Sequence, residues 1–325
     1  MSAITEAIIS GAGSGSGALE NLARGLSSGV SKDSVIRLHE PLAKRTTLRV
    51  GGPADIYAEP AAVADLRLCI KLCEAAGFPW VMLGRGSNLL VRDGGIRGVV
   101  ICLARGEFVG IQIEGCRIKA GAGARLKHVA VEARRASIGG LEFLEGIPGS
   151  VGGALRMNAG AMGAAIFDRL ETVSAMDRCG RIAEHSASSL AAGYRHCAFF
   201  RDHIALSAVL KGYFGDVGEI EGRMRALNSK RWETQPAAPS AGCIFKNPDS
   251  IPAGRLIEEL GLKGKRVGGA QISELHGNFF VNDGSATARD VLALIEMVQK
   301  RAMEERQIPL ETEVQIVGEE EASCV

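Results

Sequence analysis

The chain has 325 residues, enough for two or three domains with sizeable hydrophobic cores. Its formal net charge of +1 leaves no electrostatic footprint for nucleic acid, and aromatic residues, at 5%, are too few to indicate a stacking platform. No apolar run reaches the roughly 18 residues of a membrane span, and the N-terminus lacks the pattern of a secretory signal. We therefore expect no nucleic-acid partner and no membrane partner.

The eight cysteines do not form the close pairs that are typical of a metal site, so no metal is expected. Reduced thiols in a cytoplasmic protein are the simplest interpretation of these cysteines. Nothing in the sequence demands more than a monomer. The 42 glycines, nearly twice ordinary usage, gather in discrete loops, as contact between a backbone and a ligand requires.

The first predicted elements follow one another as in a small α+β unit. Residues 1–30 include a Gly/Ser run and are expected to form a flexible tail. An extended segment is predicted over residues 50–60, and helical spacing of apolar residues predicts a helix over residues 60–77. Short buried strands are predicted at residues 80–83 and 99–103.

A second region begins near residue 106. Apolar and polar residues alternate over residues 109–120 and predict a β-hairpin. Residues 126–136 predict a short helix, and residues 170–176 and 204–210 predict further strands. A helix predicted over residues 216–232 leads into a third region.

Three prolines between residues 236 and 248 predict a loop without regular structure. A strong helix is predicted from about Thr287 to Gln307. Thr287 and Asp290 have the spacing of a capping box, with Asp in place of the usual Glu. Residues 310–316 then alternate in polarity, as in a terminal strand.

Two glycine-dense turns, at residues 84–90 and 146–153, each follow an apolar segment. Glycines bring backbone N–H groups close to an anion because no Cβ stands in the way. Two such turns indicate a dinucleotide diphosphate held from two sides. Neither turn fits the fingerprint of a Rossmann unit or the phosphate loop that ends in Gly-Lys-Ser/Thr, so the binding mode belongs to another architecture.

Four residues could carry chemistry, although each has a plainer interpretation. Cys243 follows a glycine and could be an acid or a nucleophile, or a structural thiol. Arg195 lies in a loop-like stretch where an arginine is usually a surface residue. Glu313 could be a solvent-facing carboxylate on a terminal strand. His276 could orient a ligand, but a lone histidine is more often a packing residue.

Taken together, these segments identify a family. The chain resembles the bacterial UDP-N-acetylenolpyruvoylglucosamine reductases, the MurB flavoenzymes of peptidoglycan precursor synthesis in cell-wall biogenesis. The matching pieces span about residues 35 to 318. Any one piece is weakly specific, but five or more in the right order are strongly specific. The pieces are residues 46–55, 84–90, 146–154, 157–161, 193–195, 240–248, 253–261 and 310–314.

The resemblance implies an α+β fold of three parts that follow the N-terminal tail. Residues 31–105 and 106–220 would be two subdomains that hold FAD between them in the manner of PCMH-type flavoproteins. A strand at residues 310–318 would return to the first of these subdomains. Residues 221–309 would form the substrate-binding domain. The chain looks like the shorter class of the family, which lacks an inserted loop that bears a tyrosine.

The family's chemistry implies a cytoplasmic, NADPH-dependent oxidoreductase with FAD. NADPH reduces the flavin, which returns the hydride to the vinyl carbon of UDP-N-acetylglucosamine-enolpyruvate, and the product is UDP-N-acetylmuramate. Arg195 matches the family's arginine, which stabilises the charge that develops on the substrate carboxylate. Glu313 matches the family's glutamate. Cys243 matches the proton donor, at a position where many relatives carry serine, and a thiol is a better acid than an alcohol.

Other positions are carried over from the family by motif. Tyr194, Lys246 and Asn247 are expected to contact the diphosphate-sugar of the substrate. The expected FAD contacts are Gly84, Arg85, Gly86, Ser87, Asn88, Leu89, Ile147, Pro148, Gly149, Ser150, Gly152, Gly153, Asn158, Ala159 and Gly160.

Two alternatives remain on the sequence alone. One is another FAD oxidoreductase of the PCMH type, such as an oxidase, and many of these bind flavin covalently through a histidine in the first glycine loop. No histidine occurs in residues 84–90. The other is a non-catalytic nucleotide-binding homologue, which would be expected to lose at least one of Arg195, Cys243 and Glu313. All three are present.

Overall fold

A computed structural model describes residues 16–321, and its contacts divide the chain into two compact units, which we describe separately. Unit 1 contains the chain up to Leu38, Asp55–Gly84 and Gly98–Ser229. Unit 2 contains His39–Ala54, Arg85–Arg97 and the chain from Lys230 onward. Most of the two expected FAD-binding subdomains therefore falls within unit 1.

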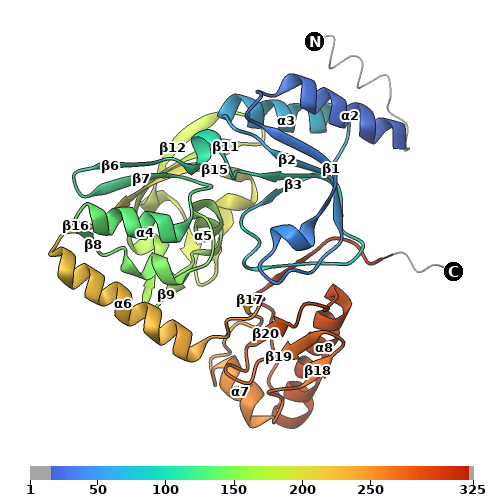
Figure 1. The fold of residues 1–325 in the computed structure, drawn as a ribbon, viewed down its shortest axis with the longest axis vertical. Coiled ribbons are helices and arrows are strands. Elements are labelled where there is room, and N and C mark those ends of the chain that lie inside the picture. The colour runs from blue at the N-terminus through green and yellow to red at the C-terminus, as the bar shows by residue number, and fades with distance from the viewer. Residues whose placement is uncertain (1–15, 322–325) are drawn as a thin grey trace. The chain divides into compact units, whose positions relative to one another are not determined.

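A four-stranded sheet with the order β1-β2-β5-β3 forms one layer of unit 1 (Figure 1). Its strands are β1 (Val35–Pro41), β2 (Pro53–Glu59), β3 (Trp80–Leu83) and β5 (Ile96–Cys102). β3 runs parallel to β5, and the helix α3 (Val63–Ala75) lies between β2 and β3 in the chain. The predictions of the helix and of both short strands are confirmed.

The prediction of a flexible tail is wrong for residues 16–29, which form the helix α2 (Ser16–Gly29). Leu22 and Leu26 on this helix are completely buried, and α2 packs against α3. Leu19, Leu22 and Leu26 recur at helical spacing and mark a short amphipathic helix. The glycine- and serine-rich residues before them hide this pattern in the sequence. Residues 1–15 of the expected tail lie outside the described residues.

A second, antiparallel sheet of unit 1 has the order β12-β11-β15-β7-β6. The hairpin of β6 and β7 confirms the prediction at residues 109–120, and it turns at Gly115, where φ is +57°. The helices α4 (Leu126–Arg135) and α5 (Val151–Met157) follow in the chain. The strands are β6 (Ile111–Glu114), β7 (Arg117–Gly121), β11 (Leu170–Asp177), β12 (Ile182–Ser186) and β15 (His203–Lys211).

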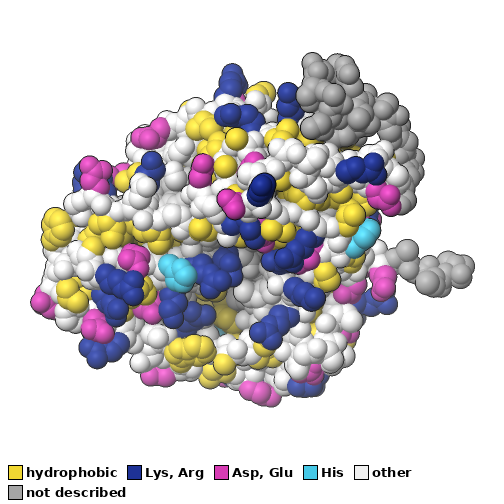
Figure 2. All heavy atoms as spheres, turned by 45° about the horizontal axis from the view of Figure 1, so that its top comes forward, with side chains coloured by type: hydrophobic (Ala, Val, Ile, Leu, Met, Phe, Trp, Pro, Cys, Tyr) yellow, Lys and Arg dark blue, Asp and Glu magenta, His cyan; other side chains and the backbone are white. Residues whose placement is uncertain are grey.

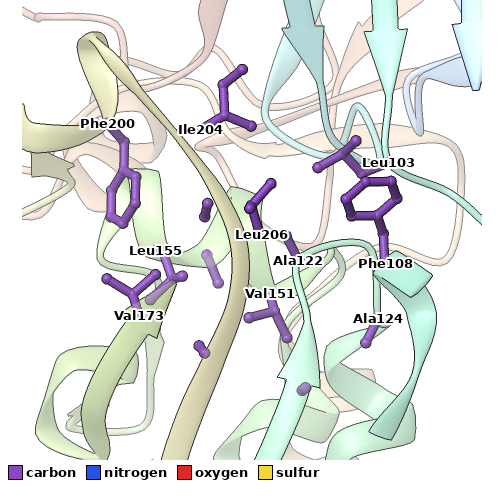
Figure 3. Close-up of a cluster of buried hydrophobic side chains, with 14 of the residues drawn as sticks. Leu103, Phe108, Ala122, Ala124, Val151, Leu155, Val173, Phe200, Ile204 and Leu206 are labelled. Carbon is purple, nitrogen blue, oxygen red and sulfur yellow. The ribbon is translucent and has the colours of Figure 1, made fainter. Parts of the chain in front are cut away.

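The main core of unit 1 is built where α5 packs against β15 and β7 (Figure 3). Val151 and Leu155 of α5 are completely buried, as is Val173 of β11. Phe108 and Leu206 extend the same apolar cluster. Because this core fixes α5, it also fixes the glycine-rich start of that helix.

Unit 2 contains a sheet with the order β17-β20-β19-β18, and the long helix α8 contacts β18 and β19. The prediction of a loop without regular structure over residues 236–248 is wrong at β17, because the prolines lie outside that strand. The C-terminal strand β21 runs parallel to β4, which directly follows the first glycine loop. The elements are β4 (Leu89–Val91), β17 (Ser240–Cys243), α7 (Ala253–Glu259), β18 (Arg266–Val267), β19 (Ala270–Ile272), β20 (Phe279–Asn282), α8 (Ala288–Arg306) and β21 (Gln315–Val317).

The start of α8 is capped as the sequence predicts. The Thr287 hydroxyl accepts a hydrogen bond from the Asp290 N–H, and the Asp290 carboxylate accepts one from the Thr287 N–H. Asp93 adds a second cap, because its two carboxylate oxygens accept the N–H groups of Ala288 and Arg289. These bonds tie α8 to the segment that follows the first glycine loop within unit 2.

Several short strands and the helix α6 complete the chain. The boundary between unit 1 and unit 2, at Ser229 and Lys230, lies within α6. On the face shown in Figure 2, side chains of both charge signs are interspersed with hydrophobic ones. Among residues 16–321, no helix is both long and apolar enough to cross a membrane, and no cluster of three His, Cys, Asp or Glu could hold a metal. The remaining elements are β8 (Ile138–Gly139), β9 (Gly160–Ala161), β10 (Ala164–Ala165), β13 (Ala192–Gly193), β14 (His196–Cys197), β16 (Tyr213–Phe214) and α6 (Val217–Thr234).

Candidate functional site

The first glycine loop is fastened at Gly86. Its carbonyl accepts hydrogen bonds from both the N–H and the hydroxyl of Thr47. Gly86 has φ +62°, and a Cβ there would lie 2.4 Å from the Arg45 carbonyl oxygen, so only glycine fits. Within the described part of the chain, no protein oxygen accepts the N–H of Gly86 or Ser87. These two N–H groups can therefore serve an anionic ligand.

The second glycine loop does not stay irregular, because its last residues begin α5. The N–H of Val151 donates to the Ala124 carbonyl at 3.0 Å, and that of Gly152 donates to the Ala122 carbonyl at 2.7 Å. A Cβ on Gly152 would lie 3.1 Å from the Ala122 Cβ. The glycine at 152 thus allows close packing, and its N–H is already used by the protein.

The segment of residues 121–124, which receives these bonds, is not among the predicted site residues. A Cβ on Gly123 would lie 1.5 Å from the Leu103 carbonyl oxygen, and one on Gly121 would lie 2.2 Å from the Phe108 carbonyl oxygen. The signal was the small-residue run Ala120-Gly121-Ala122-Gly123-Ala124 at the end of a predicted strand. This run anchors the start of α5.

Two features near α5 are explained by a bound group: an open helix surface at Gly153 and a buried oxygen atom of Asn158. A Cβ on Gly153 would meet only Ser150 Oγ, at 3.6 Å, so the helix surface there is open. Asn158, which ends α5 with φ +40°, has a buried side-chain oxygen that no described residue donates to. Buried polar atoms normally find a partner, and a ligand that carries N–H or O–H groups would supply one. The residues present therefore fit a flavin dinucleotide.

Arg195 sits at the tip of a two-residue hairpin between β13 and β14. It takes φ +59°, a left-handed conformation that costs a non-glycine residue about 1–2 kcal/mol. Its guanidinium lies 5.0 Å from the centre of the Tyr194 ring, within cation–π range. Strain of this kind gathers at functional sites. The Asn158 amide donates to the Gly193 carbonyl at 3.2 Å, so the hairpin is tied to the end of α5.

Cys243 ends β17 directly after a β-bulge. The pairing with β20 is irregular between Ser240 and Cys243, and Gly242 has φ +77°. A bulge of this kind redirects the next side chain. The carbonyl of Ile244 then accepts the N–H groups of Glu313, at 2.8 Å, and Val314, at 3.3 Å. Unit 2 therefore places Cys243 and Glu313 on neighbouring stretches of backbone.

Glu313 is also tied to the first glycine loop. The Asn88 amide donates to the Glu313 carbonyl at 3.1 Å, and the Gln315 N–H donates to the Asn88 carbonyl. Both the Cys243 and Glu313 side chains are half-buried. Within unit 2, hydrogen bonds to main-chain carbonyls thus join a predicted cofactor contact to the stretches that carry two predicted catalytic residues, whereas Arg195 belongs to unit 1.

The predicted substrate contacts are in part engaged with the protein. Lys246 pairs with Glu311 at 2.6 Å, and the exposure of Glu311 leaves this ion pair worth only about 0–1 kcal/mol. The Asn247 side-chain oxygen accepts the Ala253 N–H at the start of α7. The Lys246 ammonium can exchange partners at little cost. No residue in the range 16–321 accepts a hydrogen bond from the Asn247 NH₂ group, which can therefore serve a ligand.

His276 is a packing residue, as the plainer interpretation has it. Its ring lies 4.9 Å from the Phe279 ring, and Nδ1 accepts the Asn278 N–H. Burial lowers the pKa of His276 below its ordinary value. The neutral ring therefore serves the backbone of this turn.

Comparison with known proteins matches both parts of the chain. Residues 54–186 match the FAD binding domain, and residues 235–317 match the UDP-N-acetylenolpyruvoylglucosamine reductase C-terminal domain. A UDP-N-acetylenolpyruvoylglucosamine reductase of Clostridium botulinum is 45% identical over 288 residues, covering 88% of this chain and 93% of its own. One from Pelobacter propionicus is 43% identical over 294 residues, covering 90% of this chain and 99% of its own.

A solved structure agrees with these matches. The crystal structure of UDP-N-acetylenolpyruvylglucosamine reductase (MurB) from Thermus caldophilus superposes with a TM-score of 0.76 at 40% sequence identity. It covers 87% of this chain and 98% of its own. The α+β fold with an FAD-binding part and a MurB C-terminal part, predicted from the sequence, is confirmed.

Proposed function

The chain belongs to the UDP-N-acetylenolpyruvoylglucosamine reductase family, and we propose that it is the FAD-dependent oxidoreductase of that name in peptidoglycan synthesis. It reduces the enolpyruvyl group of UDP-N-acetylglucosamine-enolpyruvate to give UDP-N-acetylmuramate, with NADPH as hydride donor. The observation that carries this proposal is the likeness to named reductases along nearly their whole length.

FAD, when bound, supplies the flavin N5 that takes a hydride from NADPH and gives it to the terminal vinyl carbon of the substrate. The N–H groups of Gly86 and Ser87 would contact its diphosphate, because nothing among the described residues accepts them. The open face of Gly153 and the side-chain oxygen of Asn158 would lie against the flavin part.

Arg195 would bind the substrate carboxylate. When the vinyl carbon gains a hydride, negative charge builds on the neighbouring carbon, C2, and on the carboxylate attached to it. A planar guanidinium matches a carboxylate with two parallel hydrogen bonds and is charged at every relevant pH. The hairpin that holds Arg195 in a left-handed conformation preorganises this charge, so little reorganisation is needed during the reaction.

Cys243 would protonate C2 and complete the reduction. A thiol with an ordinary pKa near 8.5 is largely protonated at neutral pH and releases its proton far more readily than a serine hydroxyl. The bulge at Gly242 fixes the position from which the thiol acts. Glu313 in its protonated form would hydrogen-bond the carboxylate as its charge develops.

Tyr194, Lys246 and Asn247 would hold the diphosphate-sugar. The exposed Lys246–Glu311 pair supports this role for Lys246, since the ammonium can leave a weak partner for a diphosphate. We further propose that the enzyme acts in the bacterial cytoplasm, where its nucleotide substrates occur, and that it acts as a monomer.

The visible spectrum of the purified protein, recorded anaerobically, tests the proposal. A yellow protein that NADPH bleaches and UDP-N-acetylglucosamine-enolpyruvate recolours would establish both half-reactions. Bleaching without recolouring would leave a flavin reductase with another oxidant. A colourless protein that FAD cannot reconstitute would contradict the assignment of the glycine loops.

A further inference from the structure

The segment that follows Cys243 is held from one side by a single residue, Asn278. The Asn278 carbonyl accepts the Ile244 N–H at 2.9 Å. Its side-chain oxygen accepts the Phe245 N–H at 2.9 Å, and its NH₂ group donates to the Phe245 carbonyl at 2.8 Å. The side-chain amide thus does for Phe245 what a neighbouring strand would do.

The same segment is held from the other side by the residues around Glu313. The Lys246 N–H donates to the Glu311 carbonyl at 2.9 Å, and the Glu313 N–H donates to the Ile244 carbonyl at 2.8 Å. Phe245 and Thr312 form an antiparallel bridge. Asn278 therefore holds Ile244 and Phe245 from one side, and the stretch that carries Glu313 holds Ile244 and Lys246 from the other.

Burial makes the Asn278 clamp difficult to replace. Asn278 is 2% exposed and Phe245 is 1% exposed, so water cannot take over these bonds. A loss of the amide would leave the Phe245 N–H and carbonyl without partners, and the backbone would shift to find new ones. Because Ile244 joins Cys243 to Glu313, such a shift changes the spacing of those two residues.

We propose that Asn278 is a positioning residue that sets the register between Cys243 and Glu313 and thereby controls protonation of the substrate. The inference rests on the proposed function, in which these two residues act only after the flavin is reduced. Asn278 would then affect recolouring by the enolpyruvyl substrate and leave bleaching by NADPH unchanged. A shift of about 1 Å can slow a step by about a hundredfold, so a large effect is expected.

The test compares Asn278→Ala and Asn278→Asp with a matched variant, Asn282→Ala. Asn282 ends β20, the strand that begins directly after Asn278. It is 3% exposed, and its side chain bonds the Leu48 carbonyl and the N–H groups of Gly284 and Ala286. Its backbone N–H bonds the Pro239 carbonyl, which the alanine variant keeps, and among the described residues its side chain makes no bond to Ile244, Phe245 or Lys246. Stopped-flow spectra of each FAD-loaded protein would give the bleaching and the recolouring rates separately.

Recolouring of Asn278→Ala should slow by at least about tenfold, with bleaching within about threefold of the wild type. Asn278→Asp should recover recolouring, relative to the wild type at the same pH, as the pH falls. A protonated carboxyl can accept from the Phe245 N–H and donate to its carbonyl, whereas a carboxylate can only accept. His276, whose Nδ1 accepts the Asn278 N–H, is the neighbouring titratable group, and the ratio removes the part of the pH dependence that His276 already gives the wild type.

Two results would overturn the inference. One is an equal loss of both half-reactions in the Asn278 variants, and the other is an equal loss of recolouring in Asn282→Ala, since either would indicate a general structural defect. If the wild type itself is bleached but not recoloured, the proposed function fails and the inference fails with it. If Asn278→Ala does not fold, the pH-dependent recovery of Asn278→Asp decides the question.

Discussion

Replacement of Gly153 by alanine should stabilise the folded apoprotein but weaken the binding of FAD. Gly153 is the third residue of α5, and an added Cβ would have Ser150 Oγ as its nearest neighbour, at 3.6 Å, an ordinary contact. Glycine within a helix is less stable than alanine by about 0.5–1 kcal/mol. The apoprotein with Gly153→Ala should therefore be more stable by about that amount, which in a chain of this size raises the Tm by about 1–3 °C.

The same methyl group should weaken FAD binding, because it fills the open face against which we place the flavin. A misfit that costs about 1.4–3 kcal/mol raises the Kd for FAD by about tenfold to a hundredfold. Thermal unfolding of the apoprotein and a fluorescence titration with FAD would measure the two effects. Gly222→Ala is the control, since Gly222 lies inside α6 with nothing within 4 Å of an added Cβ.

Gly222→Ala should give the same stabilisation and an unchanged Kd for FAD. A Gly153→Ala protein that binds FAD as the wild type does would refute the cofactor role of this glycine. A destabilised apoprotein would instead show that the start of α5 tolerates no side chain there. In either case the open face beside Gly153 would need another explanation.

Three further predictions follow from single contacts. Cys243→Ser should keep turnover, whereas Cys243→Ala should be bleached by NADPH but not recoloured by substrate, and normal turnover of the alanine variant would contradict the assignment. Gly123→Ala should destabilise unit 1 by at least about 3 kcal/mol in denaturant unfolding, because its Cβ would lie 1.5 Å from the Leu103 oxygen. Burial opposes ionisation of Asp65, but hydrogen bonds from Ser31, Ser34 and the Ala62 backbone together outweigh it and hold its pKa below the ordinary value. Its folded pKa is therefore depressed, so Asp65→Asn should unfold more easily at pH 7, and the difference should shrink as the pH falls below about 4.

Periodicity and turn chemistry predicted the elements that depend on local sequence. The helix α3, the hairpin of β6 and β7 and the capped helix α8 all lie where apolar spacing and capping residues place them. Each of these elements is determined by contacts between residues near one another in the chain. The first glycine loop is predicted for the same reason, since a left-handed and crowded position such as Gly86 requires glycine.

The parts that the sequence did not reveal depend on contacts across long stretches of chain. The sequence predicts a glycine-dense turn over residues 146–153, although α5 begins at Val151, because two of the seven residues of α5 are glycines. The distant run at residues 121–124 accepts the N–H groups of Val151 and Gly152. The bonds that Asn278 makes to the Phe245 backbone cross 33 positions, and no local pattern announces them. An asparagine in such a role looks like any polar residue before the fold is known.

The structure also explains why cysteine can stand at position 243, where the family resemblance implies a serine in many relatives. Main-chain features place residue 243: the bulge at Gly242 aims it, and the bonds of Ile244 and Phe245 fix the backbone after it. These features do not depend on whether oxygen or sulfur stands at the end of the side chain. The backbone therefore specifies where the proposed proton donor stands, and the side chain specifies only how acidic it is. A serine or a cysteine can fill such a position, whereas a change at Gly242 or Asn278 would move either one.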